Sequence, residues 1–383
     1  MKATKRHRKS CKRLIAEVAE LLGRVAVNHL ALWPKPAAVT GMIPGRPMAG
    51  WRMEQAGASG SAGERGTVGE SYHRPIMGEE VVHFLQPASG KLILDGTLGG
   101  AGHTEMFLKN GASVWATDRD PAAIARAREL LEPTYGERFT AIHSNFADFP
   151  TVLEAAGLNL KMDGMFFDLG LSSRQLENPS RGFSFMRTGR LDMRFEPDAT
   201  LSAEEIVNKW PEEELVRIIR LYGEDPSAKR IARAIVKRRE SKAILLTTEL
   251  AEVIASVIPQ RGRTHPATKT FQAIRLEVNQ ELQSLERALE AAPKWLAPGG
   301  RLVVLTFHSL EDRIVKHFLR DRSQPEWDRP EWPAPRPNPN YQFNLVVRKA
   351  IEATEAEIKS NPRARSCKLR VAERISSGPS NQS

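Results

Sequence analysis

Apolar and polar residues follow strand and helix periods along most of the chain from Tyr72 onwards. Short apolar runs that predict buried strands occupy residues 91–95, 113–118, 139–146, 162–170 and 301–307. Amphipathic segments that predict helices occupy residues 78–86, 103–111 and 121–133. Strands that alternate with helices are typical of a parallel sheet with crossover connections. The pattern therefore predicts an α/β fold.

Between about 181 and 265 the pattern becomes purely helical. Helices are predicted over residues 201–210, 211–223, 225–241 and 247–259, and Ser202 and Glu205 have the spacing of a capping box at the first of them. One long amphipathic helix is then predicted over 268–296, before the last apolar run. We therefore expect an all-helical insertion at 181–265 between two parts of the α/β domain, 71–180 and 266–383.

The first 70 residues differ from the rest of the chain. A basic run at 2–13 and an amphipathic stretch at 14–33 precede a Gly/Ser-rich linker. Three interpretations stay open: a disordered tail or a start codon assigned too early, an arm that attracts RNA, and an organelle-targeting leader. Met53 and Met77 are the internal start candidates. Near the other end, Pro-rich residues at about 325–340 predict a loop.

Composition and charge narrow the class of protein. Hydrophobic residues make up 41% and charged residues 27% of the chain, as in ordinary globular proteins. No apolar run approaches the roughly 20 residues that a membrane span needs, so we expect no membrane segment. Cys11 and Cys367 suggest neither a disulfide framework nor a metal site, which favours a cytoplasmic protein without a metal. Most of the net charge of +10 lies in the first 50 residues, so overall basicity does not by itself indicate nucleic-acid binding.

The stretch LILDGTLGGAGHT, residues 92–104, carries the clearest chemical signal. A buried strand ends in Asp95, a glycine-rich turn follows, and then a helix begins. Glycines let the backbone approach a ligand, and a helix N-terminus offers free N–H groups. Glu105 stands where the dinucleotide fingerprint G-x-G-x-x-G needs its third glycine, and no Gly-Lys-Ser/Thr follows for a P-loop. A tight structural turn remains the alternative.

Two further acids end predicted strands. Asp118 ends the second strand, where an acid can accept both hydroxyls of an adenosine ribose, and Asp168 ends the fourth. Ligands of open α/β sheets bind at the carboxyl ends of the strands. Three successive strand ends that carry an acid or glycines are suited to bind S-adenosylmethionine or a dinucleotide. An NAD-linked dehydrogenase therefore stands as a second class at this point.

Several motifs together resemble one family. DGTLGGAGHT, DRDPAAIARA, DLGLSSRQL followed by RGFSFM and LDMR, LTFHSLEDR, and NPRARSCKLRVAER, all within residues 72–383, are similar to the bacterial 16S ribosomal RNA cytosine-N4 methyltransferase family. The resemblance implies a class I, Rossmann-like, S-adenosylmethionine-dependent methyltransferase domain interrupted by a helical domain. The implied reaction methylates the exocyclic N4 amine of a decoding-centre cytidine. The implied partner is 16S ribosomal RNA in the small subunit, with monomer or homodimer left open.

The same resemblance implies a set of donor-binding residues. They are Ala101, Gly102, His103, Asp118, Phe146, Asp168 and Gln175. Ala101 departs from a Gly-Gly-His form, and its methyl group should matter little unless its φ is positive.

Candidate catalytic residues follow from the chemistry of the acceptor. Cytosine N4 is a poor nucleophile because its lone pair is delocalised into the ring, so a group that accepts its hydrogen bond would assist. Asp168 is the nearest candidate, with Ser172 and Ser173 as secondary ones. The stacking aromatic that many amino-directed methyltransferases carry after this strand is missing. Phe183 or Phe185 could replace it, and core packing is the alternative for both.

Basic residues near these motifs are candidate phosphate contacts. Arg181, Arg187 and Arg194 lie in the loop after the fourth strand, and Arg230, Arg233 and Lys237 share a face of a predicted helix, for which a solvated surface is the alternative. A non-catalytic ribosome-assembly factor that binds RNA is a third class of function.

Overall fold

The computed structural model describes residues 75–376 except 159, 261, 263 and 329. The predictions for residues 1–70 lie outside the described residues. Within the described ranges no helix combines the length and the apolar character that crossing a membrane requires.

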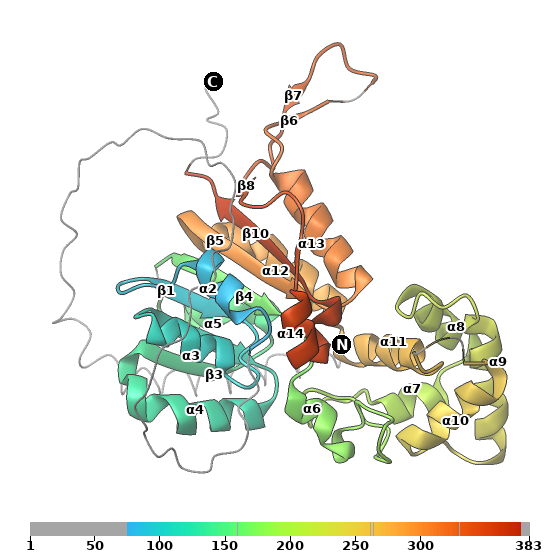
Figure 1. Cartoon of the computed structure of the whole chain (residues 1–383). Coiled ribbons are helices and arrows are strands. Elements are labelled where there is room, and N and C mark those ends of the chain that lie inside the picture. The colour runs from blue at the N-terminus through green and yellow to red at the C-terminus, as the bar shows by residue number, and fades with distance from the viewer. Residues whose placement is uncertain (1–74, 159, 261, 263, 329, 377–383) are drawn as a thin grey trace, which may run out of the picture.

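The core of the molecule is a twisted open sheet (Figure 1). Its strands run in the order β3-β2-β1-β4-β5-β10-β8, and β9 pairs with β10. The bounds are β1 Leu92–Asp95, β2 Ser113–Asp118, β3 Phe139–His143, β4 Met162–Asp168, β5 Leu296–Thr306, β8 Phe343–Leu345, β9 Ile351–Glu352 and β10 Lys368–Arg374. The pairs from β3 to β5 are parallel, whereas β10 is antiparallel to β5. The predicted α/β fold is confirmed.

Helices cover both faces of the sheet. On one face lie α2 (Gly78–Leu85), α3 (Gly102–Lys109) and α4 (Pro121–Tyr135), and on the other lie α5 (Phe149–Ala155), α12 (Glu281–Trp295) and α13 (Ser309–Arg322). Asp120 caps α4, because its side chain accepts from the Ala122 N–H over 3.0 Å. The chain therefore winds to both sides of the sheet, which leaves the strand ends open to a ligand.

A separate helical unit packs around its own apolar cluster. It contains α7 (Ala203–Lys209), α8 (Glu212–Leu221), α9 (Ala228–Ser241), α10 (Thr247–Val257) and α11 (Thr268–Asn279). Ser202 accepts from the Glu205 N–H at the start of α7, where the capping box was predicted.

Two details of the predicted insertion are wrong. Residues 182–202 form irregular chain, which fits the loop predicted around Arg187 and Arg194 but not a purely helical insertion, with an isolated bridge between Arg190 and Leu246. The single long helix predicted over 268–296 is broken at Gln280, which has φ 49°. The half before this break, α11, buries Phe271 and Ile274 in the helical cluster, so the packing of that unit extends beyond residue 265.

Other elements also differ from the prediction. Helix α4 continues through Pro133 to Tyr135. The Pro-rich loop contains a small ribbon of β6 (Glu326–Trp327) and β7 (Arg336–Pro337), which projects from the body in Figure 1. The antiparallel strand β10 was not predicted.

Candidate active site

Three acids meet at the carboxyl edge of the sheet. Asp95, Asp118 and Asp168 end the neighbouring strands β1, β2 and β4. The chain order reverses between β1 and β4, which is where ligands bind in such sheets. An open cavity of about 1220 Å³ lies at this edge, and Asp118 and Asp168 line it. This exceeds the roughly 300–1,000 Å³ typical of a pocket for one small molecule.

The glycine loop shapes one wall of the cavity. A Cβ added at Gly96 would lie 2.4 Å from the Phe167 ring, and one at Gly102 would lie 2.6 Å from Pro75 Cγ. At Gly100 an added Cβ would meet no protein atom within 4 Å. The first two glycines are therefore needed for packing, whereas Gly100 leaves the backbone bare toward the cavity that it lines.

Asp95 stabilises the glycine loop from its buried side. Its Oδ2 accepts from the Thr104 hydroxyl over 2.6 Å, and its Oδ1 accepts from the Thr97 N–H over 3.0 Å. Burial raises the pKa of Asp95 to about 6, although both hydrogen bonds act in the opposite direction. With 1% of its surface exposed, Asp95 supports the loop rather than facing a ligand.

Asp118 binds the same loop from the next strand. Its Oδ2 accepts from the Gly99 N–H over 2.7 Å, and its Oδ1 accepts from the Asp120 N–H over 2.8 Å. Burial raises the pKa of this carboxyl. Each carboxylate oxygen has a second lone pair, so Asp118 can still accept two hydroxyl groups of a ligand.

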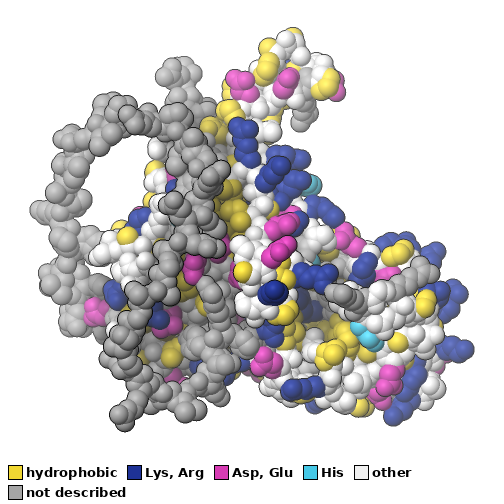
Figure 2. Space-filling model, in the orientation of Figure 1, with side chains coloured by type: hydrophobic (Ala, Val, Ile, Leu, Met, Phe, Trp, Pro, Cys, Tyr) yellow, Lys and Arg dark blue, Asp and Glu magenta, His cyan; other side chains and the backbone are white. Residues whose placement is uncertain are grey.

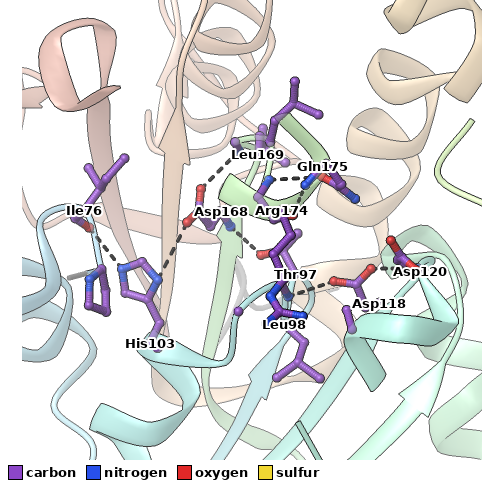
Figure 3. A pocket seen from close by; sticks show the side chains of 18 of the residues that line it. Ile76, Thr97, Leu98, His103, Asp118, Asp120, Asp168, Leu169, Arg174 and Gln175 are labelled. Atoms are coloured by element: carbon purple, nitrogen blue, oxygen red, sulfur yellow. Dashed lines mark hydrogen bonds and ion pairs between the residues drawn. The ribbon is translucent and has the colours of Figure 1, made fainter. Parts of the chain in front are cut away.

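Asp168 lies between the glycine loop and α3 (Figure 3). Its Oδ1 accepts from the Gly170 N–H over 3.0 Å, and its Oδ2 lies 3.6 Å from His103 Nδ1. The other ring nitrogen of His103 lies 3.0 Å from the Ile76 carbonyl oxygen. Burial raises the pKa of Asp168, and the nearby His103 charge opposes that rise. The structure thus brings two predicted donor-site residues, 65 positions apart, into one pair.

The remaining donor-site residues take different positions. Phe146 lines the cavity, and its ring centroid lies 5.6 Å from that of Phe167. Gln175 and Ser172 also line it, yet they form the capping box of α6 (Ser173–Glu177) with each other. The Ser172 hydroxyl oxygen accepts from the Gln175 N–H over 3.3 Å, which favours a structural role over a catalytic one. The side chain of Ser173 lies outside the described ones.

Ala101 is in the left-handed region, with φ 65°, and its side chain is buried. It forms the N-cap of α3, where the family resemblance leads one to expect glycine. The positive φ makes the alanine methyl group an energetic cost, so this departure does matter. Ala101 does not line the cavity, so it can act on the donor only through the loop backbone.

Several residues predicted to contact RNA make their contacts with other residues of this chain. Phe183 is 7% exposed and stacks on Phe195, with ring centroids 5.4 Å apart. Arg181 pairs with Asp120 over 2.7 Å and also donates to two carbonyl oxygens, while Arg194 donates to the Asp192 carboxylate over 2.6 Å. These contacts favour a structural role for Phe183, Arg181 and Arg194, although Arg181 also lines the cavity.

Four other predicted RNA contacts lie at the surface. Arg187, Arg230, Arg233 and Lys237 are exposed. Figure 2 shows Lys and Arg side chains gathered over the outer edge of the helical unit and over α13. Phe185 is half-buried, with its ring 4.8 Å from both His265 and Phe271.

The C-terminal segment forms a cavity wall that was not predicted. Helix α14 (Glu355–Ser360) and the turn after it contribute Glu357, Asn361 and Arg363 to the lining. Glu357 Oε1 accepts from the Met77 N–H over 2.6 Å, and Arg363 lies 3.7 Å from Glu177. Asn361 and Arg363 belong to the motif NPRARS, but the motif alone does not show that these residues lie beside the strand ends.

His308 and Glu311, which follow β5, form a cap at the start of α13. Glu311 Oε2 accepts from the Phe307 N–H over 2.8 Å, and the His308 ring accepts from the Glu311 N–H. This favours a structural role for the pair, although Glu311 also reaches the cavity wall. In the described part of the chain, no group of three or more His, Cys, Asp or Glu side chains could hold a metal ion.

Comparison with known proteins decides the family. The model of the MraW methylase family matches residues 70–375. The chain belongs to the MraW methylase family. A relative from Anaeromyxobacter sp. (strain Fw109-5), named ribosomal RNA small subunit methyltransferase H, is 46% identical over 80% of this chain and 99% of its own. A relative of the same name from Paramagnetospirillum magneticum is 48% identical over 79% of this chain and 95% of its own.

The MraW methylase family is S-adenosylmethionine-dependent, so the predicted cofactor and family are confirmed. The cavity fits this donor: Asp118 offers two carboxylate oxygens, Phe146 offers a ring, and Gly100 leaves bare backbone. A solved Streptococcus mutans methyltransferase in complex with SAH aligns over 78% of this chain and 97% of its own at 12% identity, with a TM-score of 0.36. A TM-score of 0.36 is too low to support a fold assignment. The assignment rests instead on the strand order, which is that of a Rossmann-like methyltransferase domain.

Proposed function

We propose that this chain methylates the exocyclic N4 amine of one decoding-centre cytidine in the 16S ribosomal RNA of the small subunit. The observation that carries the proposal is the position of Asp168. It ends β4 inside a cavity whose other wall holds the donor-site residues, and that cavity is larger than one small ligand requires. The names of the relatives support a ribosomal RNA acceptor, and the motif resemblance supports cytidine N4.

The reaction requires the protein to align the donor with the acceptor and to make N4 more nucleophilic. S-adenosylmethionine, when bound, supplies a methyl group on a sulfonium: a bond from carbon to N4 forms, the sulfur–carbon bond breaks with its electron pair left on sulfur, and N4 loses one proton. Alignment of acceptor and donor accounts for much of the rate that a protein can add to such a displacement. The Asp168 carboxylate can accept a hydrogen bond from N4, which returns electron density to that nitrogen. Asp118 and Phe146 hold the donor, and Ser172 orients Gln175.

The acceptor base has to leave its stack to reach Asp168. Exposed basic side chains on the helical unit and on the loop before it are suited to bind the phosphates around the base; they are Arg187, Arg230, Arg233 and Lys237. Phe185 is the remaining aromatic candidate for holding the base. The same proposal implies that the protein acts in the cytoplasm on the small subunit. A non-catalytic assembly factor would keep donor binding and RNA binding without transfer.

The test is methyl transfer from labelled S-adenosylmethionine to small subunits from a strain that lacks this activity. The RNA is then digested and its nucleosides are separated. We expect label in N4-methylcytidine at a single position. Label in another nucleoside would overturn the acceptor, and donor binding without any transfer would favour the assembly factor.

A further inference from the structure

We propose that Asn361 is a specificity-determining residue for the acceptor base: its side-chain amide donates a hydrogen bond to N3 of the target cytosine while Asp168 accepts one from N4. The inference rests on the function proposed above and extends it to a second atom of the base. It assigns to the C-terminal wall of the cavity a role in selecting cytosine.

The strand register places the turn before β10 at the edge of the sheet that holds Asp168. Asp168 pairs with Leu305 in β5, and Leu305 pairs in turn with Leu369 in β10. Because β10 is antiparallel to β5, the residues just before β10 lie at the carboxyl edge of the parallel strands. Asn361 caps the short turn Pro362–Ser366 that leads into β10, and it lines the same cavity as Asp168.

A buried thiol also indicates that this wall is close to Asp168. Burial raises the pKa of Cys367, and the charges of Asp168 and Glu357 raise it further. The two carboxyl groups therefore lie near the same sulfur atom, one at the end of β4 and the other on α14. Together with the strand register, this places the C-terminal wall beside Asp168.

The segment that carries Asn361 is held at both of its ends. At one end Glu357 Oε1 accepts from the Met77 N–H over 2.6 Å, and at the other Arg363 lies 3.7 Å from Glu177 in α6. Between these contacts the Asn361 N–H donates to the Glu357 carbonyl oxygen over 2.6 Å. In Figure 1, α14 accordingly lies between the strand ends and α6. The backbone of Asn361 is thus fixed before any base binds.

The orientation of the Asn361 amide leaves its donor group available. Its Oδ1 accepts from the Arg363 N–H over 3.3 Å, and because a backbone N–H can only donate, the atom that faces it is the oxygen. Its Nδ2 donates to no acceptor among the described residues, and the residue is half-buried. The Ser360 hydroxyl, by contrast, already donates to the Glu357 carbonyl oxygen over 3.0 Å. Asn361 therefore offers an N–H donor to a ligand in the cavity.

Asp168 and Asn361 together match the Watson–Crick edge of cytosine. That edge presents a donor at N4 and an acceptor at N3, whereas uracil presents an acceptor at O4 and a donor at N3. A carboxylate and an amide N–H are complementary to the cytosine pattern, but on uracil each would face a group of its own kind. A site with this arrangement rejects uracil because its own polar groups are then left unpaired.

Asn178 provides a matched control residue. It also lines the cavity, and its Oδ1 caps the turn Pro179–Arg181 by accepting from the Ser180 N–H over 3.0 Å. Unlike Asn361 it is exposed, so water competes for its amide. Aspartate and serine also cap such turns, so the same substitutions at both positions keep the cap and remove only the amide.

The first measurement compares Asn361→Ser with Asn178→Ser. Serine adds no charge and keeps the cap, but it removes the amide donor. We expect kcat/KM for small subunits to fall by about 10–100-fold in Asn361→Ser, with the Kd for S-adenosylmethionine and the thermal unfolding temperature unchanged. Asn178→Ser should stay within a few-fold of the original protein. Equal effects in the two variants, or a loss of donor affinity that matches the loss of kcat/KM, would overturn the proposal.

The second measurement reports base discrimination without turnover. Binding of small subunits is measured with S-adenosylhomocysteine in place of the donor, both for subunits with the target cytidine and for subunits in which uridine replaces it. We expect the original protein to prefer cytidine. Asn361→Asp replaces the donor by an acceptor that can bind uracil N3–H, so the ratio of the two affinities should fall at least about tenfold. The added negative charge acts on both kinds of subunit and cancels in this ratio.

The control and the outcomes separate this inference from the proposed function. Asn178→Asp should leave the ratio unchanged. An unchanged ratio in Asn361→Asp, or no preference for cytidine in the original protein, overturns the role of Asn361 even if N4-methylcytidine is made. If the original protein makes no N4-methylcytidine on small subunits, the proposed function itself is overturned, and the assignment of N3 with it.

Discussion

Thr97 and Asp168, 71 residues apart, join the ends of two neighbouring strands. The backbone N–H of Asp168 donates to the Thr97 hydroxyl oxygen over 2.6 Å, and the adjoining Gly96 N–H donates to the Phe166 carbonyl oxygen over 2.9 Å. The glycine loop and Asp168, which we propose face the donor and the acceptor, are thus joined by hydrogen bonds at the ends of β1 and β4. A shift of the loop would move the backbone of Asp168 with it.

Replacing Thr97 by valine tests this link. Valine keeps the shape but leaves the Asp168 N–H without an acceptor, so we expect the free energy of unfolding to fall by about 1–3 kcal/mol. We also expect kcat to fall more than donor affinity does, because Asp168 loses its orientation. Urea unfolding and steady-state kinetics measure both effects. Thr97→Ser keeps the hydroxyl and should stay close to the original protein; equal losses in the two variants would mean that the hydrogen bond is irrelevant.

Ala101 gives a second prediction, because its φ of 65° costs an alanine about 1–2 kcal/mol. Ala101→Gly relieves that cost but loses a buried methyl group worth about 0.8 kcal/mol, so stability should change by less than about 1 kcal/mol. Ala101→Val puts a branched side chain into the same backbone conformation and a buried space, and should lose more than about 2 kcal/mol. Thermal unfolding of the two variants checks this, and a well-tolerated valine would contradict the observed loop conformation.

Asp95 makes stability depend on pH. Its pKa is raised to about 6 in the folded chain, above its ordinary value of 3.8, so the folded state binds more protons than the unfolded state between these values. Stability should therefore fall as the pH rises from about 4 to 6, by about 1–3 kcal/mol from this group. Asp95→Asn removes the titration and should fall less over the same range. Urea unfolding of both proteins at pH 4 and pH 7 measures the difference; parallel falls would rule Asp95 out as the cause.

The sheet and the helices that pack on it could be predicted because each has a regular apolar period. The strand-end rule also placed Asp95, Asp118 and Asp168 at one edge before their distances were known. Strand β10 was not predicted, because its partner β5 lies more than sixty residues earlier and its own run is short and half charged. The break at Gln280 was missed because no glycine or proline interrupts the apolar pattern there.

The side-chain partners in the site could not be predicted from the pattern. The loop of Arg181 and Phe183 has no period, so its sequence could not show that the guanidinium meets Asp120 and that the ring meets Phe195. Likewise, the motif around His103 implied donor binding but not its pairing with Asp168. Such contacts depend on how distant segments approach one another, which spacing along the chain does not determine.

Deleting residues 1–69 gives a prediction about the part of the chain before the family match, which begins at residue 70. We expect the shortened chain to keep its activity on small subunits within a few-fold, because the described cavity lining starts at Pro75. The measurement is kcat/KM at two salt concentrations. A large loss that is greatest at low salt and shrinks at high salt would assign an RNA-binding role to the basic residues.

Asp168 is the residue that we propose acts on the acceptor, so the most direct test separates its effect on transfer from its effect on donor binding. Asp168→Ala is compared with the original protein by calorimetric titration of S-adenosylmethionine and by single-turnover methylation of small subunits. If Asp168 accepts the hydrogen bond and the proton of N4, the transfer rate should fall by about 10²–10⁴-fold while the donor Kd changes by less than about tenfold. Equal losses in both quantities would make Asp168 a donor-binding residue and contradict its proposed role in the transfer step.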